Sequence, residues 1–432
     1  MRDFARSDDA AVQAQLDRLA ALSLPQGRLG LDTVRAMLAR LGDPHLALPP
    51  VFHVAGTNGK GSTCAFLRAM LEADGKRVHV FTSPHLVRFN ERIRLAGNLI
   101  SDAALAALLA EVLDAAESAG LGPSFFEVTT AAAFLAFART PADACVIEVG
   151  LGGRLDATNV LERPAACGIA TLGFDHEQFL LVPEEGVTWQ GLARIGFEKA
   201  GIAKRGVPLV TQSYPADAAR AVAQTASAAR AELFMRGQGW RAEVGETIAY
   251  ADCFGPLDLP LPAMPGAHQA DNAALAVAIL RHQDKVPVAR EVMASGILAA
   301  RWPARMQRLG PGPLADLAQG REAWLDGGHN PDAGAALARH FAGRKLHLVL
   351  GMLANKDARA LTGPLAGNLL SLSVVPVPGH AAHPPEVFAG GRAFSDVPSA
   401  LALLPEDGAP VLIAGSLYLA GEVLRLNREW PS

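Results

Sequence analysis

The feature that most constrains the fold of this chain is an apolar segment, Val51–Ala55, that runs directly into the glycine-rich stretch GTNGKGS at residues 56–62. A pattern typical of a helix follows. A strand, a glycine loop and a helix in this order suit a phosphate group, because small residues let backbone N–H groups face it and the helix N-terminus adds positive potential. Gly61 separates Lys60 from Ser62, so the common GxxxxGK[ST] spacing is only partly met. We interpret the stretch as a nucleotide-binding loop; an ordinary glycine turn is the alternative.

Short apolar segments alternate with helical patterns, and this alternation predicts the fold class. In the first part of the chain, strands are predicted over residues 51–55, 77–81, 144–149, 165–170 and 207–211, and helices over 60–73, 103–118 and 127–139. The pattern resumes after Arg301, with strands over 323–325, 345–350, 370–375 and 410–414 and helices over 333–341, 356–365 and 416–426. The alternation favours an α/β protein with parallel sheets. Residues 237–265, rich in turn residues, are predicted to form an irregular antiparallel excursion.

Length and composition limit the possible classes of protein. At 432 residues the chain is long enough for two domains. The stretch Ile297–Gln307 contains a Trp-Pro step, and we expect the domain boundary there, between residues 298 and 299. Hydrophobic residues make up 50% and charged residues 19%, which excludes intrinsic disorder. The formal net charge of −4 provides no basic field, so neither nucleic acid nor a membrane surface is an expected partner.

The cysteines and the N-terminus indicate the compartment. Cys64, Cys145, Cys167 and Cys253 are far apart and form no CxxC pair. Neither a disulfide framework nor a zinc knuckle is therefore predicted, and all four are expected to be buried free thiols. Residues 1–16 are charged and lack the apolar core of a signal peptide. No apolar run approaches the ~20 residues of a membrane span. We therefore expect a cytoplasmic protein.

Two further loops carry groups suited to chemistry. Glu148 ends a predicted strand beside a glycine loop, a frequent position for a metal or substrate ligand; a purely structural carboxylate is the alternative. A dinucleotide fingerprint would need glycine where Leu155 stands, so that interpretation is rejected. Asp175 and His176 follow the next predicted strand. A neutral imidazole there is either a ligand of a metal or phosphate or a structural residue.

Ten segments, in order along about residues 20 to 425, together resemble one family: folylpolyglutamate synthase/dihydrofolate synthase, within the Mur ligase superfamily. They are HVAGTNGKGS (53–62), SPHLVRFNERI (83–93), FEVTTAAA (126–133), EVGLGGRLDATN (148–159), FDH (174–176), EKAGI (198–202), HQADNAALA (268–276), LDGGHNPD (325–332), GMLANKD (351–357) and GSLYLAGEV (415–423). One glycine loop is a weak signal, whereas ten collinear segments are very specific. The first two segments resemble the folate branch of the superfamily rather than its cell-wall branch.

The resemblance implies a fold and a reaction. The fold is α/β, with a P-loop domain of the Mur ligase type at residues 1–298 that binds ATP, and a smaller Rossmann-like glutamate ligase domain at residues 299–432. The active site is implied to lie in the cleft between them. The γ-phosphate of ATP passes to a carboxylate, and the amino group of L-glutamate attacks the acyl phosphate. The implied substrates are dihydropteroate and reduced folates, and the implied oligomeric state is a monomer.

The resemblance also assigns site residues. The positions matching ATP contacts are Asn58, Gly59, Lys60, Gly61 and Ser62, with a second set at Asn272, Arg305 and Asp326. The positions matching Mg²⁺ ligands are Ser83, Glu148, His176 and Lys199. Two ions are expected, and Mn²⁺ is expected to substitute because an imidazole is an unusual ligand for Mg²⁺. Lys199 matches a lysine that the superfamily carbamylates, which requires a neutral amine first.

The remaining assignments concern the organic substrates. The positions matching pterin contacts are Ser124, Phe125, Phe126, Glu127, Leu155, Asp156 and Ala157, and those matching the place of incoming glutamate are His329 and Ser416. The expected catalytic residues are Lys60, Lys199 and His329. Structural roles stay open for several of them. Lys199 and Asn272 suit a helix surface, Asp326 suits a strand-end cap, and Phe125 and Phe126 suit a core.

Departures from the family pattern bear on substrate choice. Where the family shows Ile-Asp-Leu-Gly-Leu-x-Arg, residues 27–33 read GRLGLDT, which lack the acid and the terminal arginine. The segment Leu181–Gln190 is several residues longer than usual, Phe197 stands in place of an arginine, and Ala304 stands in place of a glycine. The altered loop near Arg28 therefore puts the use of dihydropteroate in question.

Three functions remain to be compared. The first is a bifunctional ligase, which we favour because the segments PSFFE (123–127) and LDATN (155–159) resemble the bifunctional bacterial type. The second is a ligase confined to polyglutamylation of folates. The third is a nucleotide-binding protein without ligase activity. The presence of Arg305, Asp326, His329 and Ser416 argues against the third.

Overall fold

The computed structural model describes residues 6–22 and 30–431. Residues 27–29 of the altered N-terminal loop, which include Arg28, lie outside the described residues. The chain forms two compact units. The first contains residues 1–84, 88–263 and 270–301, and the second contains residues 85–87, 264–269 and 302–432. The chain passes finally into the second unit between Arg301 and Trp302.

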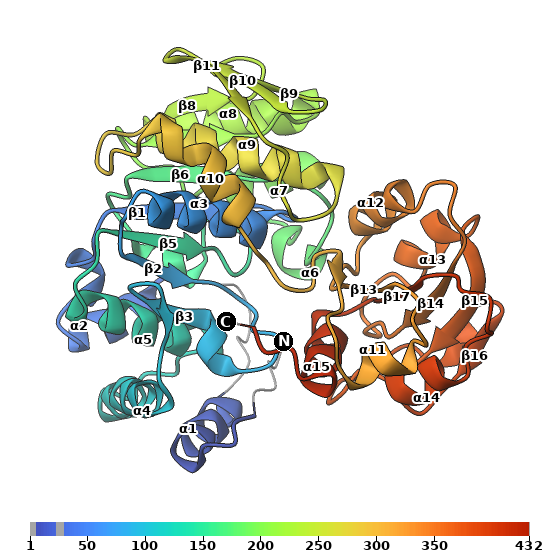
Figure 1. Ribbon diagram of the computed structural model, residues 1–432. Coiled ribbons are helices and arrows are strands. Elements are labelled where there is room, and N and C mark those ends of the chain that lie inside the picture. The colour runs from blue at the N-terminus through green and yellow to red at the C-terminus, as the bar shows by residue number, and fades with distance from the viewer. Residues whose placement is uncertain (1–5, 23–29, 432) are drawn as a thin grey trace. The chain divides into compact units, whose positions relative to one another are not determined.

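The first unit is built on an eight-stranded sheet with the order β4-β3-β2-β5-β1-β6-β7-β8 (Figure 1). Its strands are β1 (Val51–Ala55), β2 (Val78–Phe81), β3 (Ile93–Leu95), β4 (Asn98–Leu99), β5 (Ala144–Glu148), β6 (Ala166–Ile169), β7 (Pro208–Thr211) and β8 (Glu232–Met235). The six strands from β2 to β8 in that order are parallel, and β3 and β4 form an antiparallel edge. Every residue of β1, β2, β5 and β6 is buried. Burial on both faces explains why these strands read as continuous apolar runs.

Helices cover this sheet. They are α1 (Ala10–Ala21), α2 (Asp32–Arg40), α3 (Lys60–Ala73), α4 (Asp102–Ser118), α5 (Phe125–Arg139), α6 (Glu177–Leu180), α7 (Gly191–Ala200), α8 (Ala216–Ala229), α9 (Ala267–Arg281, from residue 270 on in this unit) and α10 (Met293–Ala299). One core joins α1, α2, α4 and α5 to the strands, and a second joins α7 and α8 to β6 and β7. Helix α3 packs on β1, β2 and β5. Helices therefore pack against the central strands of the sheet, and the loops that follow these strands lie beside the helices.

The region 237–265 confirms the predicted antiparallel pairing but is more regular than expected. Strands β9 (Trp240–Val244), β10 (Ile248–Asp252) and β11 (Gly255–Leu259) form a three-stranded meander. Arg281 on α9 donates to both carboxylate oxygens of Asp252, at 2.6 and 2.7 Å, and so ties the meander to the helix. The expectation of four buried thiols is wrong at Cys253, which is exposed because it lies in the two-residue turn between β10 and β11.

The second unit contains a six-stranded sheet with the order β12-β13-β17-β14-β15-β16. Its strands are β12 (Gln307–Arg308), β13 (Ala323–Asp326), β14 (Leu346–Leu350), β15 (Leu369–Val374), β16 (Gly391–Ala393) and β17 (Val411–Ala414). Its helices are α11 (Pro313–Leu317), α12 (Pro331–His340), α13 (Arg359–Leu365), α14 (Val397–Ala402) and α15 (Leu417–Asn427). All strands but β12 run parallel. The two sheets confirm the predicted α/β class.

Element bounds differ from the predicted ones mainly at helix ends. β1 and α3 have the predicted bounds. α5 begins two residues earlier than predicted because Ser124 caps it. α13 begins at Arg359 rather than 356, because the Asp357 carboxylate accepts the Arg359 N–H and holds the preceding residues in a turn. Within the part of the chain that is described, no helix has both the length and the apolar character that a membrane crossing requires.

Candidate active site

Two glycines allow the loop after β1 to take its shape. Gly59, directly before α3, has φ +85°, and a Cβ built there would lie 2.4 Å from Oδ1 of Asn272. A Cβ on Gly56 would lie 2.9 Å from Cβ of Ala170. A side chain at either position would displace its neighbour, and at Gly59 it would also be strained by the left-handed backbone. The same close approach places Asn272, a predicted ATP contact, against the loop.

Polar contacts fix the loop to the end of β6. The N–H of Thr57 donates to the carbonyl of Thr171 at 2.7 Å, and its Oγ1 donates to the carbonyl of Gly173 at 3.0 Å. Lys60 is the first residue of α3, and its Nζ lies 3.3 Å from the carbonyl oxygen of Thr57. Ser62 is buried in the first helical turn. The first N–H groups of a helix have no partner within it, so this turn offers donors and a positive potential to an anion.

The ends of β2 and β5 bring two predicted metal ligands together. The N–H of Ser83, just after β2, donates to Oε2 of Glu148 at 3.2 Å. Glu148 is the last residue of β5 and is 4% exposed. Burial and then the charge of Glu148 raise the pKa of the Cys64 thiol on α3 well above its usual value. The carboxylate of Glu148 is therefore a buried negative charge next to the helix that carries Lys60.

His176 follows β6, which lies on the other side of β1 from β5. Its φ of +53° is unusual for a residue with a Cβ, and its ring Nε2 lies 3.9 Å from Oδ2 of Asp175. Among residues 6–22 and 30–431, no group of three or more His, Cys, Asp or Glu is placed to hold a metal ion. A cation in this region would therefore need ligands of other kinds besides Glu148 and His176.

Lys199 reaches the glycine loop from α7. Its Nζ donates to the carbonyl of Gly56 at 3.0 Å, and the residue is 4% exposed. Burial and then the charge of Lys60 lower the pKa of Lys199 to about 7. A large fraction of the amine is therefore neutral near neutral pH, which is the state that reacts with CO₂. This burial contradicts the alternative, a lysine on the helix surface.

The predicted pterin contacts lie on two neighbouring segments of the first unit. Ser124 and Glu127 form a capping box: the Ser124 N–H and hydroxyl both donate to Oε2 of Glu127 at 2.8 Å. Phe125 and Phe126 are half-buried, and the ring of Phe126 fills the space that a Cβ on Gly150 would need. Both aromatic side chains also pack against the core formed with α4 and α5. The capping and packing roles are thus evident in the structure.

The loop after β5 is organised by Asp156. Its buried carboxylate accepts the N–H of Leu151 at 2.8 Å and both the N–H and Oγ1 of Thr158, at 3.0 and 2.5 Å. Oγ1 of Thr158 also lies 2.8 Å from Nε2 of His53 on β1. Leu155 is half-buried and Ala157 is buried on either side of Asp156. This network holds the glycine loop 150–153 in one conformation.

In the second unit the predicted residues gather at the ends of β13 and β17. The carboxylate of Asp326 accepts the N–H of Met306 at 2.8 Å and of Gly328 at 2.7 Å. Ser416 caps α15 by accepting the N–H of Tyr418 at 3.1 Å. Asp326 pairs in register with Ala414, so the two loops are adjacent. Carboxyl ends of parallel strands are where α/β proteins bind ligands.

Arg305 and His329 lie in the same group. A Cβ on Gly327 would lie 3.0 Å from Nη1 of Arg305, and Nδ1 of His329 lies 3.1 Å from the carbonyl oxygen of Gly327. Ala304, where glycine was expected, has φ +54°. Glycine adopts that left-handed conformation without strain, so the backbone at this position gives a physical reason for the glycine of the family pattern.

No family model matches the chain. The folylpolyglutamate synthase of Lacticaseibacillus casei is 32% identical over 418 residues, which cover 90% of this chain and 92% of that protein. The dihydrofolate synthase/folylpolyglutamate synthase of Escherichia coli is 33% identical over 415 residues, covering 92% and 91%. The chain belongs to the dihydrofolate synthase/folylpolyglutamate synthase family.

Solved structures of the family agree with this assignment. The structure of E. coli FolC in complex with DHPP and ADP has a TM-score of 0.82 and 31% identity, covering 96% of this chain and 97% of that chain. The Yersinia pestis bifunctional enzyme complexed with AMPPNP and Mn has a TM-score of 0.82 and 30% identity, with the same coverage. The predicted family and the two-domain α/β fold are confirmed. As a member of this family, the chain is a ligase that forms carbon–nitrogen bonds.

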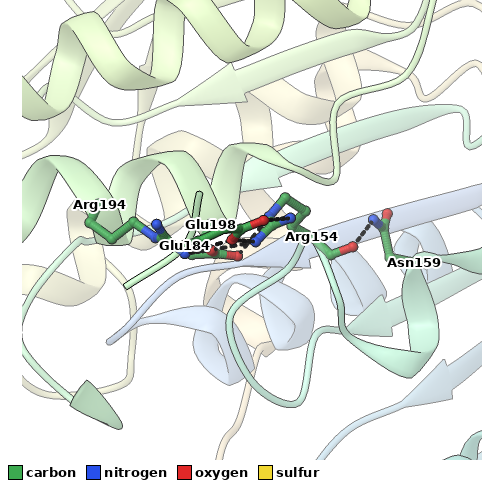
Figure 2. Close-up of polar contacts among 5 residues, drawn as sticks. All are labelled: Arg154, Asn159, Glu184, Arg194 and Glu198. Atoms are coloured by element: carbon green, nitrogen blue, oxygen red, sulfur yellow. Dashed lines mark hydrogen bonds and ion pairs between the residues drawn. The ribbon is translucent and has the colours of Figure 1, made fainter. Parts of the chain in front are cut away.

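A cluster of four charged side chains was missed by the sequence analysis (Figure 2). Arg154, from the glycine loop of the family motif, and Arg194, from α7, both donate to Glu184 and Glu198. Arg154 and Glu198 lie within segments that resemble the family, yet they received no role there. A charged residue among glycines and apolar residues was the only available signal, and a sequence does not reveal which opposite charge will meet it.

Proposed function

We propose that the protein is a bifunctional ligase that joins L-glutamate to dihydropteroate, forming dihydrofolate, and to reduced folates, extending their glutamate chain. ATP-dependent ligation of glutamate to folates is the reaction of its family. The observation that carries the proposal is the meeting of Lys60, Lys199 and Asn272 at the glycine loop of the first unit. Such a loop with the charge of Lys60 beside it suits a triphosphate and the charge that develops when phosphate is transferred.

The reaction assigns a task to each group. Lys60 and the first N–H groups of α3 bind the phosphates of ATP, and the γ-phosphate passes to the substrate carboxylate. The acyl phosphate has a good leaving group, which a free carboxylate lacks. The glutamate amino group then attacks the acyl carbon, and phosphate leaves. Donors placed in advance around the transferred phosphoryl group lower the barrier to its transfer. In the second unit, Arg305 and Asp326 contact ATP, and His329 and Ser416 receive glutamate.

The residues fit a hard divalent cation. The Ser83 N–H donates to Glu148, so the two residues are adjacent and each carries an oxygen ligand; Glu148 is a buried carboxylate whose charge favours a cation nearby. We propose that Ser83, Glu148, His176 and a carbamylated Lys199 hold two Mg²⁺ ions, or Mn²⁺ in their place. When bound, the metal neutralises phosphate charge and orients the oxygen atoms. Lys199 suits carbamylation because its amine is buried and its pKa is lowered to about 7.

The remaining expectations belong to the same proposal. Ser124, Phe125, Phe126, Glu127, Leu155, Asp156 and Ala157 form the pterin side of the site. Residues 1–298 constitute the ATP-binding domain and residues 299–432 the glutamate ligase domain. The protein acts as a monomer in the cytoplasm, without nucleic acid or membrane. Its net charge of −4 supports the absence of an anionic partner surface.

The test of this function is glutamate-dependent release of ADP in the presence of ATP and Mg²⁺. Parallel assays contain dihydropteroate or tetrahydrofolate, and each is repeated without glutamate. We expect activity with both substrates. Activity with tetrahydrofolate alone would show that the enzyme only extends folates, as the altered loop near Arg28 makes conceivable. No activity with either substrate, in protein that binds ATP, would leave a nucleotide-binding protein without ligase activity.

Replacing Gly59 by alanine is expected to raise the KM for ATP about tenfold. A Cβ there would meet Asn272 at 2.4 Å, and the φ of +85° adds strain of ~1 kcal/mol or more. Gly75→Ala is the matched control, since Gly75 has φ +77° but no atom within 4 Å of the added Cβ. Steady-state kinetics with varied ATP measure both variants. An equal rise in the KM for ATP in both variants would mean that backbone strain, and not a change at the glycine loop, causes the loss.

A further inference from the structure

The four-residue cluster in the first unit has an uncommon composition for a buried site. The side chains of Arg194 and Glu198 are each 7% exposed, that of Glu184 is 15% exposed and that of Arg154 is 24% exposed. Two positive and two negative charges balance, and each arginine contacts both glutamates (Figure 2). Removing one member of such a set leaves an uncompensated buried charge. Glu184 is therefore held strongly in place.

Glu184 comes from the segment Leu181–Gln190, which is longer than the family pattern. It accepts from Nη2 of Arg154 at 2.6 Å and from Nη2 of Arg194 at 2.9 Å. The ring of Phe197 lies beneath both guanidinium groups, 5.2 Å and 5.5 Å from their Cζ atoms. Cations over an aromatic face gain further stabilisation. Phe197, which stands in place of the family's arginine, thus supports Arg154 and Arg194, and these two residues bind the longer segment through Glu184.

Arg154 links this cluster to the loop that precedes the predicted pterin contacts. Its N–H donates to the carbonyl of Glu198 at 2.8 Å, and its carbonyl accepts from Nδ2 of Asn159 at 2.9 Å. A Cβ on Gly201 would lie 2.3 Å from Cβ of Arg154, so the loop rests directly on the end of α7. The next residue in the chain is Leu155. The side chain of Arg154 is thus fixed by Glu184 and Glu198, and its backbone by separate contacts.

The segment that contains Glu184 also forms one wall of a cavity of about 410 Å³. Residues 151–155 line one side of it, and residues 178–180 and 182–184 line another. A Cβ on Gly152 would lie 2.9 Å from Cδ2 of Leu180, which shows how closely the two walls approach. The ion pairs of Glu184 are the polar contacts that join these walls on the side of α7.

We propose that Glu184 is a positioning residue for the folate-side substrate: through Arg154 it holds the loop 151–156 and the segment 178–184 in the spacing that this substrate requires. The proposal rests on the proposed function, in which Leu155, Asp156 and Ala157 contact that substrate. In this role Glu184 acts through Arg154. Because the backbone of Arg154 keeps its own hydrogen bonds, loss of Glu184 loosens the loop without unfolding it.

The test is the variant Glu184→Gln, which keeps the shape and removes the charge. We expect KM for dihydropteroate and for tetrahydrofolate to rise about five- to tenfold, while kcat and the KM for ATP change less than twofold. Glu185→Gln is the matched control, because Glu185 is the exposed neighbour in the same segment; its kinetics should equal those of the unchanged protein. An unchanged folate-side KM in Glu184→Gln would overturn the proposal, as would an equal rise in the KM for ATP.

A second measurement does not depend on activity. Amide hydrogen exchange across residues 150–159 is expected to be faster in Glu184→Gln than in the unchanged protein, and unaltered in Glu185→Gln. If Glu184→Gln does not fold, the charge-balanced pair Glu184→Gln with Arg194→Gln is measured instead, with the same expectation, because Arg154 again loses Glu184. Unchanged exchange at 150–159 refutes the positioning role. If the unchanged protein ligates neither substrate, the proposed function fails and the substrate role of Glu184 fails with it, while the exchange result still decides whether Glu184 holds the loop 151–156.

Discussion

Replacing Lys60 by methionine is expected to lower kcat/KM for ATP-dependent ligation by about 10²–10³-fold, or ~2.7–4 kcal/mol. Lys60 is the first residue of α3, and its amine lies over the glycine loop, 3.3 Å from the carbonyl of Thr57. At this position its charge would face the phosphates of ATP and the negative charge that moves during transfer. Methionine keeps the length and the apolar stem, so the change removes the charge and little packing. Steady-state ADP release, with ATP and folate varied in turn, measures the loss.

Two controls separate this effect from general ones. Lys285→Met removes an exposed lysine whose amine pairs with the neighbouring Asp284, and its kinetics should stay within twofold. Thermal unfolding of Lys60→Met should match that of the unchanged protein, because Lys60 is half-buried and does not form part of a core. Activity of Lys60→Met within a factor of three of the unchanged protein would contradict the assignment of the loop as the phosphate site.

Replacing Lys199 by methionine is expected to lower kcat about 10³-fold, or ~4 kcal/mol, without lowering stability. A carbamate on Lys199 would supply an anion that methionine cannot replace. The amine is buried, and burial lowers its pKa to about 7. Burying this polar group lowers the free energy of unfolding, and methionine removes that penalty. The melting temperature should therefore stay equal or rise. Loss of activity together with undiminished stability would identify a chemical role.

The pH dependence has a definite sign. The pKa of Lys199 is about 7 in the folded protein and 10.5 for the unperturbed group. Between these values the unfolded chain binds more protons, so this residue makes stability rise with pH from about 7 to about 10.5. The neutral fraction of the amine rises from about a tenth at pH 6 to about nine tenths at pH 8. At fixed dissolved CO₂, reactivation of CO₂-depleted enzyme should accelerate over the same range.

Further variants test the carbamate itself. Lys199→Ala leaves space for a small carboxylate, and formate or acetate should restore part of its activity. Lys204→Met is the matched control, since burial also lowers the pKa of Lys204 but its amine donates to Asn159 instead of the loop. Its kcat should stay within about threefold. A mass equal to the unmodified chain in native mass spectrometry at pH 8 with bicarbonate, and no rescue by carboxylates, would refute carbamylation.

The order of strands and helices could be predicted because it depends on local patterns. β1 and α3 were placed with their bounds, since an apolar run, glycines and a helical pattern follow one another directly. The helices α7, α8 and α9 were not predicted. Their hydrophobic residues are mixed with Gly, Ala and polar residues, and α9 is buried on most sides, so it has no clear apolar stripe to reveal its period.

The candidate site was predictable as a set of residues and unpredictable as an arrangement. The motifs named Lys60, Glu148 and Lys199, but they are separated by many residues in sequence. That Ser83 contacts Glu148 and that Lys199 reaches Gly56 follows from the strand order β2-β5-β1-β6 and from the packing of α7. The sequence contains no information at a single position about which strand will lie beside which.

By itself, the sequence determined the order of strand, glycine loop and helix at residues 51–73, the α/β class, the resemblance to a ligase family and the net charge of −4, because each of these depends on neighbouring residues or on composition. Only the tertiary structure decided that Lys199 is buried, that Asn272 packs on Gly59, and that Glu184 joins Arg154 and Arg194. Burial and ion pairing are set by elements far apart in the chain. The lowered pKa of Lys199 and the anchored segment at Glu184 arise from that packing.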